Sequence, residues 1–99
     1  MIDGKTYEAL KELAPALQLC GVGSLYVFGS VAKGTETAES DLDVFVDPAD
    51  KDFFKFRNFM AVYALLEDAF PQREIGYGTR EGLSPFIRET VEREAIKIF

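Results

Sequence analysis

The sequence contains no histidine and a single cysteine, Cys20, among its 99 residues. Without histidine the chain cannot carry the Ser-His-Asp or Cys-His arrangements of nucleophilic catalysis, and too few of the usual ligands remain for a zinc site. One cysteine cannot form an internal disulfide, so we expect a reducing compartment, the cytoplasm, with Cys20 as a small buried residue. Polar chemistry must therefore rest on carboxylates, backbone amides, lysine and arginine.

Long apolar runs and an excess of basic charge are also missing. No apolar stretch approaches the ~20 residues needed to cross a bilayer, and residues 1–5 lack the charged-then-apolar order of a signal peptide, so no membrane association is expected. The net charge of −6 disfavours a nucleic-acid-binding surface, because phosphate backbones require basic patches. Moderate acidity is also an ordinary way for a small protein to stay soluble.

Apolar and aromatic residues, by contrast, are plentiful. Hydrophobic residues make up 47% of the chain, with nine phenylalanines and four tyrosines, which is typical of a compact globule. The length suits one domain, residues 1–99, with a real core and little room for a separate substrate domain.

A short apolar run ends at a glycine early in the chain. Leu25-Tyr26-Val27-Phe28 is β-branched and aromatic and stops at Gly29, which is typical of a buried strand ending in a turn. Gly29 allows the backbone to approach a ligand closely, and it permits the positive φ that an anion-binding turn often needs. Ser30 adds a hydroxyl donor, Lys33 a counter-charge and Gly34 a second flexible point. We predict a phosphate-binding turn here.

Two aspartates follow on a second strand-like segment. Asp41 and Asp43 alternate with Leu42, Val44 and Val46, so the two carboxylates share one face of a strand. Neighbouring carboxylates repel each other unless a cation or a proton intervenes, and Mg²⁺ commonly takes one or two carboxylates together with phosphates and water. Either motif alone more often marks a solvated turn or face than a site. Together they indicate a site for a nucleoside triphosphate with Mg²⁺.

The combination resembles the signature of the DNA polymerase β-like nucleotidyltransferase superfamily, and in particular its stand-alone minimal nucleotidyltransferase (MNT) domains. The resemblance rests on Gly29-Ser30, ten further residues and Asp41-x-Asp43, and it extends to the Glu81-Gly82-Leu83-Ser84-Pro85 block before the last helix. It implies transfer of a nucleoside monophosphate, AMP from ATP, to an acceptor hydroxyl. Gly29 and Ser30 would hold the β and γ phosphates, Asp41 and Asp43 two Mg²⁺ ions, and Lys33 would assist as a charge.

The chain departs from that pattern at the third acid. Aligned backward from the Glu81–Pro85 block, the family's third carboxylate falls on Gly76. Glu74 lies two residues earlier, on the same face of a strand and about 7 Å away, so it is the candidate third catalytic acid. Two interpretations stay open: Glu74 replaces the missing acid, or the site binds Mg-nucleotide and transfers it poorly.

The resemblance also implies a partner, because MNT domains are typically paired with helical HEPN proteins as antitoxins. One hypothesis is therefore an enzyme that modifies such a partner. The rival hypothesis is a binding module that neutralises the partner by contact, and a third is a nucleotide-binding regulatory domain without transfer.

The rest of the sequence predicts an α/β (α+β) domain, a small mixed sheet of three or four strands covered by helices, and the resemblance implies that this is the nucleotidyltransferase fold. We expect helices near residues 5–20, 48–70 and 84–95, with a kink or break at Pro15. Asp47 is predicted to cap the second helix, whose broad apolar face is either core or partly an interface, for instance to a second copy. Residues 96–99 are either an edge strand or a helix tail.

The last helix is predicted to have an apolar inner face. The residues expected on that face are Phe86, Ile87, Thr90, Val91 and Ala95.

Overall fold

A computed structural model describes residues 2–35, 37 and 40–99 of the chain. The elements, in chain order, are α1 (Gly4–Glu12), α2 (Ala14–Leu19), β1 (Val22–Phe28), α3 (Gly29–Lys33), β2 (Leu42–Pro48), the 3-10 turn η1 (Lys51–Phe54), α4 (Phe56–Ala69), β3 (Ile75–Thr79), the 3-10 turn η2 (Arg80–Gly82), α5 (Pro85–Glu94) and β4 (Ile96–Lys97).

The strands form one mixed sheet in the order β3-β2-β1-β4. β1 pairs antiparallel with β2 and with β4, whereas β2 and β3 are parallel. The register places Phe28 of β1 and Gly76 of β3 on either side of Asp43. The predicted α/β sheet of three or four strands is therefore confirmed, and residues 96–97 are an edge strand.

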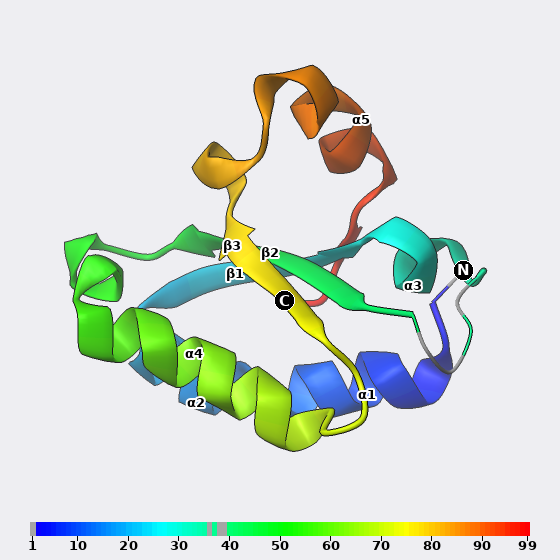
Figure 1. Cartoon of the computed structure of the whole chain (residues 1–99). Coiled ribbons are helices and arrows are strands. Elements are labelled where there is room, and N and C mark those ends of the chain that lie inside the picture. The colour runs from blue at the N-terminus through cyan, green and yellow to red at the C-terminus, as the bar shows by residue number, and fades with distance from the viewer. Residues whose placement is uncertain (1, 36, 38–39) are drawn as a thin grey trace.

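The two faces of the sheet have different covers (Figure 1). Helices α1, α2 and α4 pack on one face, and α5 stands over the other, while α3 lies at the end of the sheet where β1 stops. The face toward α1, α2 and α4 carries the fully buried strand residues Leu25, Val27, Leu42, Val44 and Val46. Because strand side chains alternate, Asp43, Phe45 and Asp47 lie on the opposite face.

The first predicted helix divides in two, one of the two outcomes expected from Pro15. Helix α1 begins at an Asp3 cap, whose carboxylate accepts a hydrogen bond from the Thr6 amide at 3.2 Å. It ends at Glu12, and Pro15 lies in the first turn of α2, where proline costs no helical hydrogen bond. Leu10 and Leu17 are fully buried against the sheet.

The predicted helix start at Asp47-Pro48 is wrong. Strand β2 continues through Pro48, the terminal position of a strand that proline tolerates, and Asp47 faces Arg80 instead of capping a helix. Asp50 is the actual cap: its carboxylate accepts a hydrogen bond from the Asp52 amide at 2.9 Å at the start of η1. Helix α4 begins only at Phe56.

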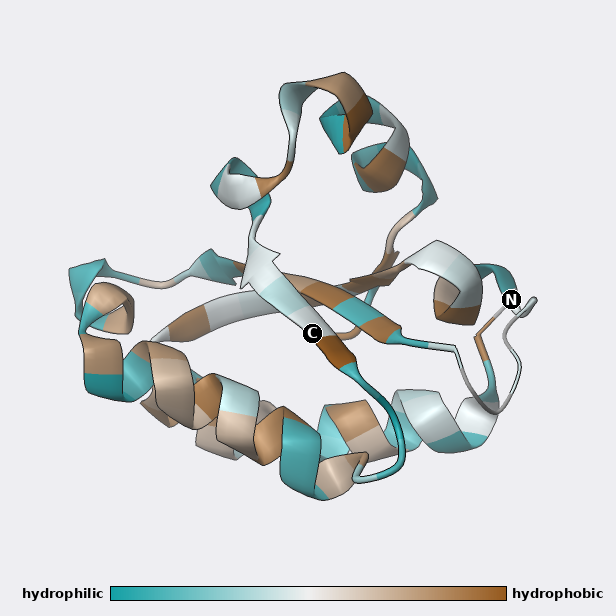
Figure 2. Ribbon diagram, in the orientation of Figure 1, coloured by the Kyte–Doolittle hydropathy of each residue, from teal (hydrophilic) through white to brown (hydrophobic). Residues whose placement is uncertain are grey.

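Helix α5 also differs from expectation, because none of its residues is buried. Phe86 and Ile87, expected on an inner face, are exposed, and Figure 2 shows apolar positions on this helix as well as on the sheet and α4. Polar contacts connect α5 to the remainder instead: the Arg88 guanidinium donates to the carbonyls of Glu81 and Leu83 at 2.8 and 3.2 Å.

Within the described residues, no helix combines the length and apolarity required to cross a bilayer.

Candidate active site

The site begins where β1 stops at Phe28 and the chain turns into α3. Gly29 adopts φ of 73°, a left-handed conformation that favours glycine, as predicted for this turn. Gly34 ends α3 with φ of 74°, so both flexible points take conformations that only glycine adopts without strain. Ser30 lies half-buried in the first turn of α3, directly after Gly29.

Asp43 lies at the centre of the site, on β2 between β1 and β3. Its Oδ2 is 2.6 Å from the point where a Cβ would stand at Gly29, and its Oδ1 is 2.5 Å from the corresponding point at Gly76. Any side chain at either glycine would therefore displace the carboxylate. Because neither glycine has a side chain, the Asp43 carboxylate fits between them. Gly76 therefore forms part of the carboxylate's immediate surroundings.

The ionised form of Asp43 is disfavoured in this position. Burial raises the pKa of the Asp43 carboxyl above its ordinary value, and the negative charge of Asp41 raises it further. Asp41 is exposed and immediately precedes β2. Two neighbouring carboxylates, one of them partly desolvated, are suited to bind a hard cation, because the cation removes their repulsion.

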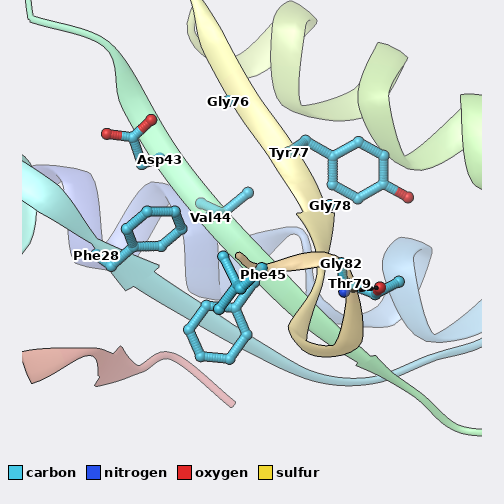
Figure 3. Close-up of a pocket in the computed structure, with 10 residues that line it drawn as sticks. Phe28, Asp43, Val44, Phe45, Gly76, Tyr77, Gly78, Thr79 and Gly82 are labelled. Atoms are coloured by element: carbon cyan, nitrogen blue, oxygen red, sulfur yellow. Dashed lines mark hydrogen bonds between the residues drawn. The ribbon is translucent and has the colours of Figure 1, made fainter. Parts of the chain in front are cut away.

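A cavity of about 210 Å³ adjoins Asp43 on the side of β3. Its lining includes Gly76 and Gly78 of β3, the Gly82–Leu83 segment, and the aromatic residues Phe28 and Phe45. Figure 3 shows Asp43 on β2 beside Gly76, with the Tyr77 ring directed to the other face of β3. That ring faces α4, where the Tyr77 hydroxyl donates to the Phe59 carbonyl at 3.1 Å.

Arg80 holds the segment that closes this cavity. Its Nε and Nη2 each donate to Asp47 at 2.8 Å, and its Nη1 donates to Glu92 of α5 at 3.0 Å. The guanidinium carbon lies 4.9 Å from the Tyr26 ring centroid and 5.0 Å from that of Phe45. The bidentate hydrogen bond from Arg80 holds the pKa of the Asp47 carboxyl below its ordinary value.

A family profile and known proteins match this chain. The family described as nucleotidyltransferase domain matches residues 5–98. The chain belongs to the nucleotidyltransferase family. A curated relative, "Putative protein adenylyltransferase" of Methanocaldococcus jannaschii, is 26% identical over 78 residues, which cover 78% of this chain and 77% of that protein.

Two solved structures resemble this nucleotidyltransferase domain. One, described as "putative minimal nucleotidyltransferase", has a TM-score of 0.77 at 30% identity and covers 96% of this chain and 95% of its own. Another, described as "toxin-antitoxin with AMP-PNP", has a TM-score of 0.67 at 18% identity, covers 90% of this chain and 72% of its own, and shares the fold.

The structure also shows the contacts of two other predicted site residues, Lys33 and Glu74. Lys33 forms an ion pair with Glu94 of α5 at 3.4 Å. Glu74 directly precedes β3, where its carbonyl accepts from the Leu42 amide at 2.9 Å. The pKa of the Tyr63 hydroxyl on α4 is raised chiefly by Glu67, and the charge of Glu74 also contributes.

Within the part of the chain that the structure describes, Glu74 does not complete a three-acid metal site with Asp41 and Asp43. Among the residues that the structure describes, no three acidic or cysteine side chains form a cluster that could hold a metal ion. Among the described residues, the candidate metal ligands are therefore Asp41 and Asp43, without a third acid to complete the set.

Sequence reasoning missed the cavity and the arginine. The Gly76-x-Gly78 alternation was the available signal, since glycine inside a strand often marks the close approach of a ligand or another backbone. No local signal identifies Arg80, because its partner Asp47 is 33 residues away.

Proposed function

We propose that this chain is a Mg²⁺-dependent nucleotidyltransferase that transfers AMP from ATP to an acceptor hydroxyl, releasing pyrophosphate. The observation that carries the proposal is the position of the Asp43 carboxylate, which lies between the backbones of Gly29 and Gly76 and beside a cavity. A carboxylate suited to bind a cation therefore lies next to the Gly29 turn, whose backbone can approach phosphates. Family membership supports the same reaction class.

In this proposal, the turn after β1 binds the phosphates of the nucleotide. The left-handed turn at Gly29 and the Ser30 hydroxyl bind the β and γ phosphates, because the turn lacks a side chain that would keep the oxygens away. Lys33 adds positive charge nearby. Its ion pair with Glu94 is 55% and 44% exposed, so this pair itself contributes little free energy.

Asp41 and Asp43 fit Mg²⁺ as ligands. Burial, and to a smaller extent the charge of Asp41, raises the pKa of the Asp43 carboxyl, and a bound cation would offset both effects. Two carboxylates leave the remaining positions for phosphate oxygens and water. Bound Mg²⁺ would neutralise charge on the triphosphate and polarise the α phosphate.

The transfer step balances as a single displacement. The acceptor oxygen bonds to the α-phosphorus, the bond from that phosphorus to the oxygen bridging the β phosphate breaks, and pyrophosphate leaves. The hydroxyl proton must pass to a base, and we assign that role to Glu74, which precedes β3 next to the start of β2. We place the reaction in the cytoplasm, where the lone Cys20 stays reduced.

A second candidate function is a contact antitoxin, a module that neutralises a HEPN-type partner by binding it. Gly76 favours this candidate, since it occupies the position of the family's third acid and its missing side chain is replaced by the Asp43 carboxylate. Such a module would still bind Mg-ATP while transferring AMP slowly.

The test separates binding from transfer. We expect wild-type protein to bind Mg-ATP in calorimetry and, with the neighbouring-gene product as acceptor, to incorporate label from α-labelled ATP but not from γ-labelled ATP. Asp41→Asn/Asp43→Asn should lose both activities. Glu74→Gln should keep Mg-ATP affinity and lose most of the rate of pyrophosphate release.

Each outcome identifies one function. Mg-ATP binding and full neutralisation of the partner without α-label transfer would establish the contact antitoxin. Equal Mg-ATP affinity in the wild type and the double Asp→Asn variant would overturn the proposed metal site. Asp68→Asn is the matched control, because Asp68 is an exposed aspartate on α4, away from the site.

A further inference from the structure

Four residues lie in a definite order across the site. Gly29 adjoins one oxygen of Asp43, Gly76 adjoins the other oxygen, and Gly78 follows two residues farther along the same strand. The cavity lies at the β3 end of this row, where it is lined by Asp43, Gly76 and Gly78 but not by Gly29. The row therefore has a turn at one end, a carboxylate in the middle and a cavity at the other.

We infer that this cavity binds the nucleobase of the donor nucleotide, selecting a purine by ring size and stacking without distinguishing adenine from guanine. The inference rests on the proposed function, because it uses the phosphate turn to fix the direction in which the nucleotide lies.

The order of groups in a nucleoside triphosphate matches the order of the residues. The β and γ phosphates at Gly29 and a metal-bound α phosphate at Asp43 leave the ribose and base to extend in the remaining direction. That direction leads along Gly76 to Gly78 and into the cavity. A nucleotide lying the other way would place its base beyond Gly29, outside the cavity.

The shape and lining of the cavity suit a flat aromatic ring. A cavity of roughly 150 Å³ lined by apolar side chains accepts a benzene ring, so about 210 Å³ has room for a larger, two-ring heterocycle. Gly76 and Gly78 have no side chains, which leaves a flat floor on β3. The rings of Phe28 and Phe45, with centroids 5.9 Å apart, offer aromatic contact at the wall.

The same lining has few groups that could tell one purine from another. Asp43 is committed to a cation, and the Thr79 hydroxyl already accepts a hydrogen bond from the Gly82 amide at 3.1 Å. Its remaining proton could serve N7, which is an acceptor on both purines. A site that recognises by shape, without fixed hydrogen bonds, discriminates between similar ligands by no more than about 100-fold.

Gly78 offers a clean way to block the cavity. A Cβ built there meets no atom within 4 Å, and its backbone does not require glycine, so valine should fit the strand and project into the cavity. Gly76 would be a poor choice, because its Cβ displaces Asp43. Gly4→Val is the matched control, since Gly4 is equally open and lies in α1.

The experiment measures affinities of Mg-ATP, Mg-GTP, Mg-CTP and Mg-tripolyphosphate by calorimetry. Wild type and Gly4→Val should bind ATP and GTP within about tenfold of each other, and CTP at least about tenfold more weakly. Gly78→Val should bind Mg-tripolyphosphate as wild type does, but lose about tenfold or more in affinity for both purine nucleotides. Unchanged ATP affinity in Gly78→Val, or an ATP preference over GTP beyond about 100-fold, overturns the inference.

A second measurement distinguishes the two proposals. Adenosine, which has no phosphates, is titrated into ¹⁵N-labelled protein, and the amide signals of Gly76, Gly78 and Gly82 are followed. If these signals shift in the wild type but not in Gly78→Val, while Mg-tripolyphosphate fails to bind, the cavity assignment stands and the proposed function falls. If adenosine causes no shift and nucleotides bind no better than tripolyphosphate, the cavity assignment falls alone.

Discussion

At the scale of single residues, the site contains a carboxylate, Asp43, whose ionised form is disfavoured by its surroundings. The Asp43 carboxylate lies between two glycine backbones, partly removed from water and close to the charge of Asp41. A cation-binding site must hold such groups together before the cation arrives, so the free chain bears the cost of their repulsion. The positive φ of Gly29 would strain any residue with a side chain, and glycine avoids that strain.

Asp43→Asn should therefore stabilise the metal-free protein. The pKa of this carboxyl is raised in the folded state, so the native protein binds a proton that the unfolded chain has already released. The wild type's free energy of unfolding accordingly falls as pH rises from the ordinary carboxyl range through the raised pKa, and this contribution is absent in the variant. Urea denaturation should show a larger advantage of the variant at pH 7 than near about pH 4.

Adding Mg²⁺ should reverse the ranking, because the wild type alone keeps both carboxylate ligands. Asp68→Asn should show neither effect, as the exposed α4 control. A metal-free Asp43→Asn protein that is less stable than the wild type at pH 7 would contradict the view that the carboxylate is held at a cost.

At the scale of elements, polar contacts rather than a buried apolar face hold α5 over the sheet. Arg80 connects β2, η2 and α5 through Asp47 and Glu92, and Arg88 reaches back to the carbonyls before the helix. Since α5 buries none of its residues, these contacts and the η2 turn determine where the Gly82–Leu83 segment closes the cavity.

Arg80→Met should lower the free energy of unfolding by about 1–3 kcal/mol at neutral pH, because it removes charged hydrogen bonds whose side chains are only 26% and 35% exposed. The pKa of Asp47 is lowered by Arg80, so this stability is present above the ordinary carboxyl pKa and is lost as pH falls through the lowered value. Urea denaturation across pH should therefore show the cost of the substitution shrinking in acid.

The control for that measurement is Lys55→Met. The pair of Lys55 with Asp52 is 70% and 68% exposed, so its loss should cost less than about 1 kcal/mol. Similar losses in the two variants would mean that the Arg80 contacts do no more than an ordinary surface ion pair.

At the scale of the whole molecule, charge sets the conditions for binding. The chain carries a net charge of −6 within a radius of gyration of 12.6 Å, and a nucleoside triphosphate is itself strongly negative. Repulsion between them must be offset locally, and the paired carboxylates of Asp41 and Asp43 cannot do so without a cation. The metal is therefore expected to be obligatory for binding as well as for transfer.

Removal of the metal tests this expectation by thermal unfolding. At about 100 times its Kd, a ligand that binds only the native state adds roughly 2.7 kcal/mol, which for a domain of this size raises Tm by about 10 °C or more. ATP should produce that shift with Mg²⁺ and none with EDTA. An equal shift in EDTA would show that the chain binds the triphosphate without its carboxylate pair acting through a cation.

Local chemistry in the sequence determined the fold class and the centre of the candidate site. The apolar strand ending at Gly29, the alternation around Asp43 and the break at Pro15 each depend on φ preferences or side-chain periodicity, which act within a few residues. These features predicted the sheet, the turn and a kink or break of the first helix at Pro15, and in the structure that helix is divided.

Tertiary structure alone decided the features that depend on residues distant in sequence. Asp47 suits a helix cap by its local sequence, but β2 runs on through Pro48 and turns Asp47 toward Arg80, 33 residues away. The sequence shows Gly76 only as the position where the family's third acid is missing. The parallel pairing of β2 with β3 brings it next to Asp43, whose carboxylate uses the space that a side chain would fill. Strand register and long-range ion pairs fix these contacts, and neither is encoded in the spacing of nearby residues.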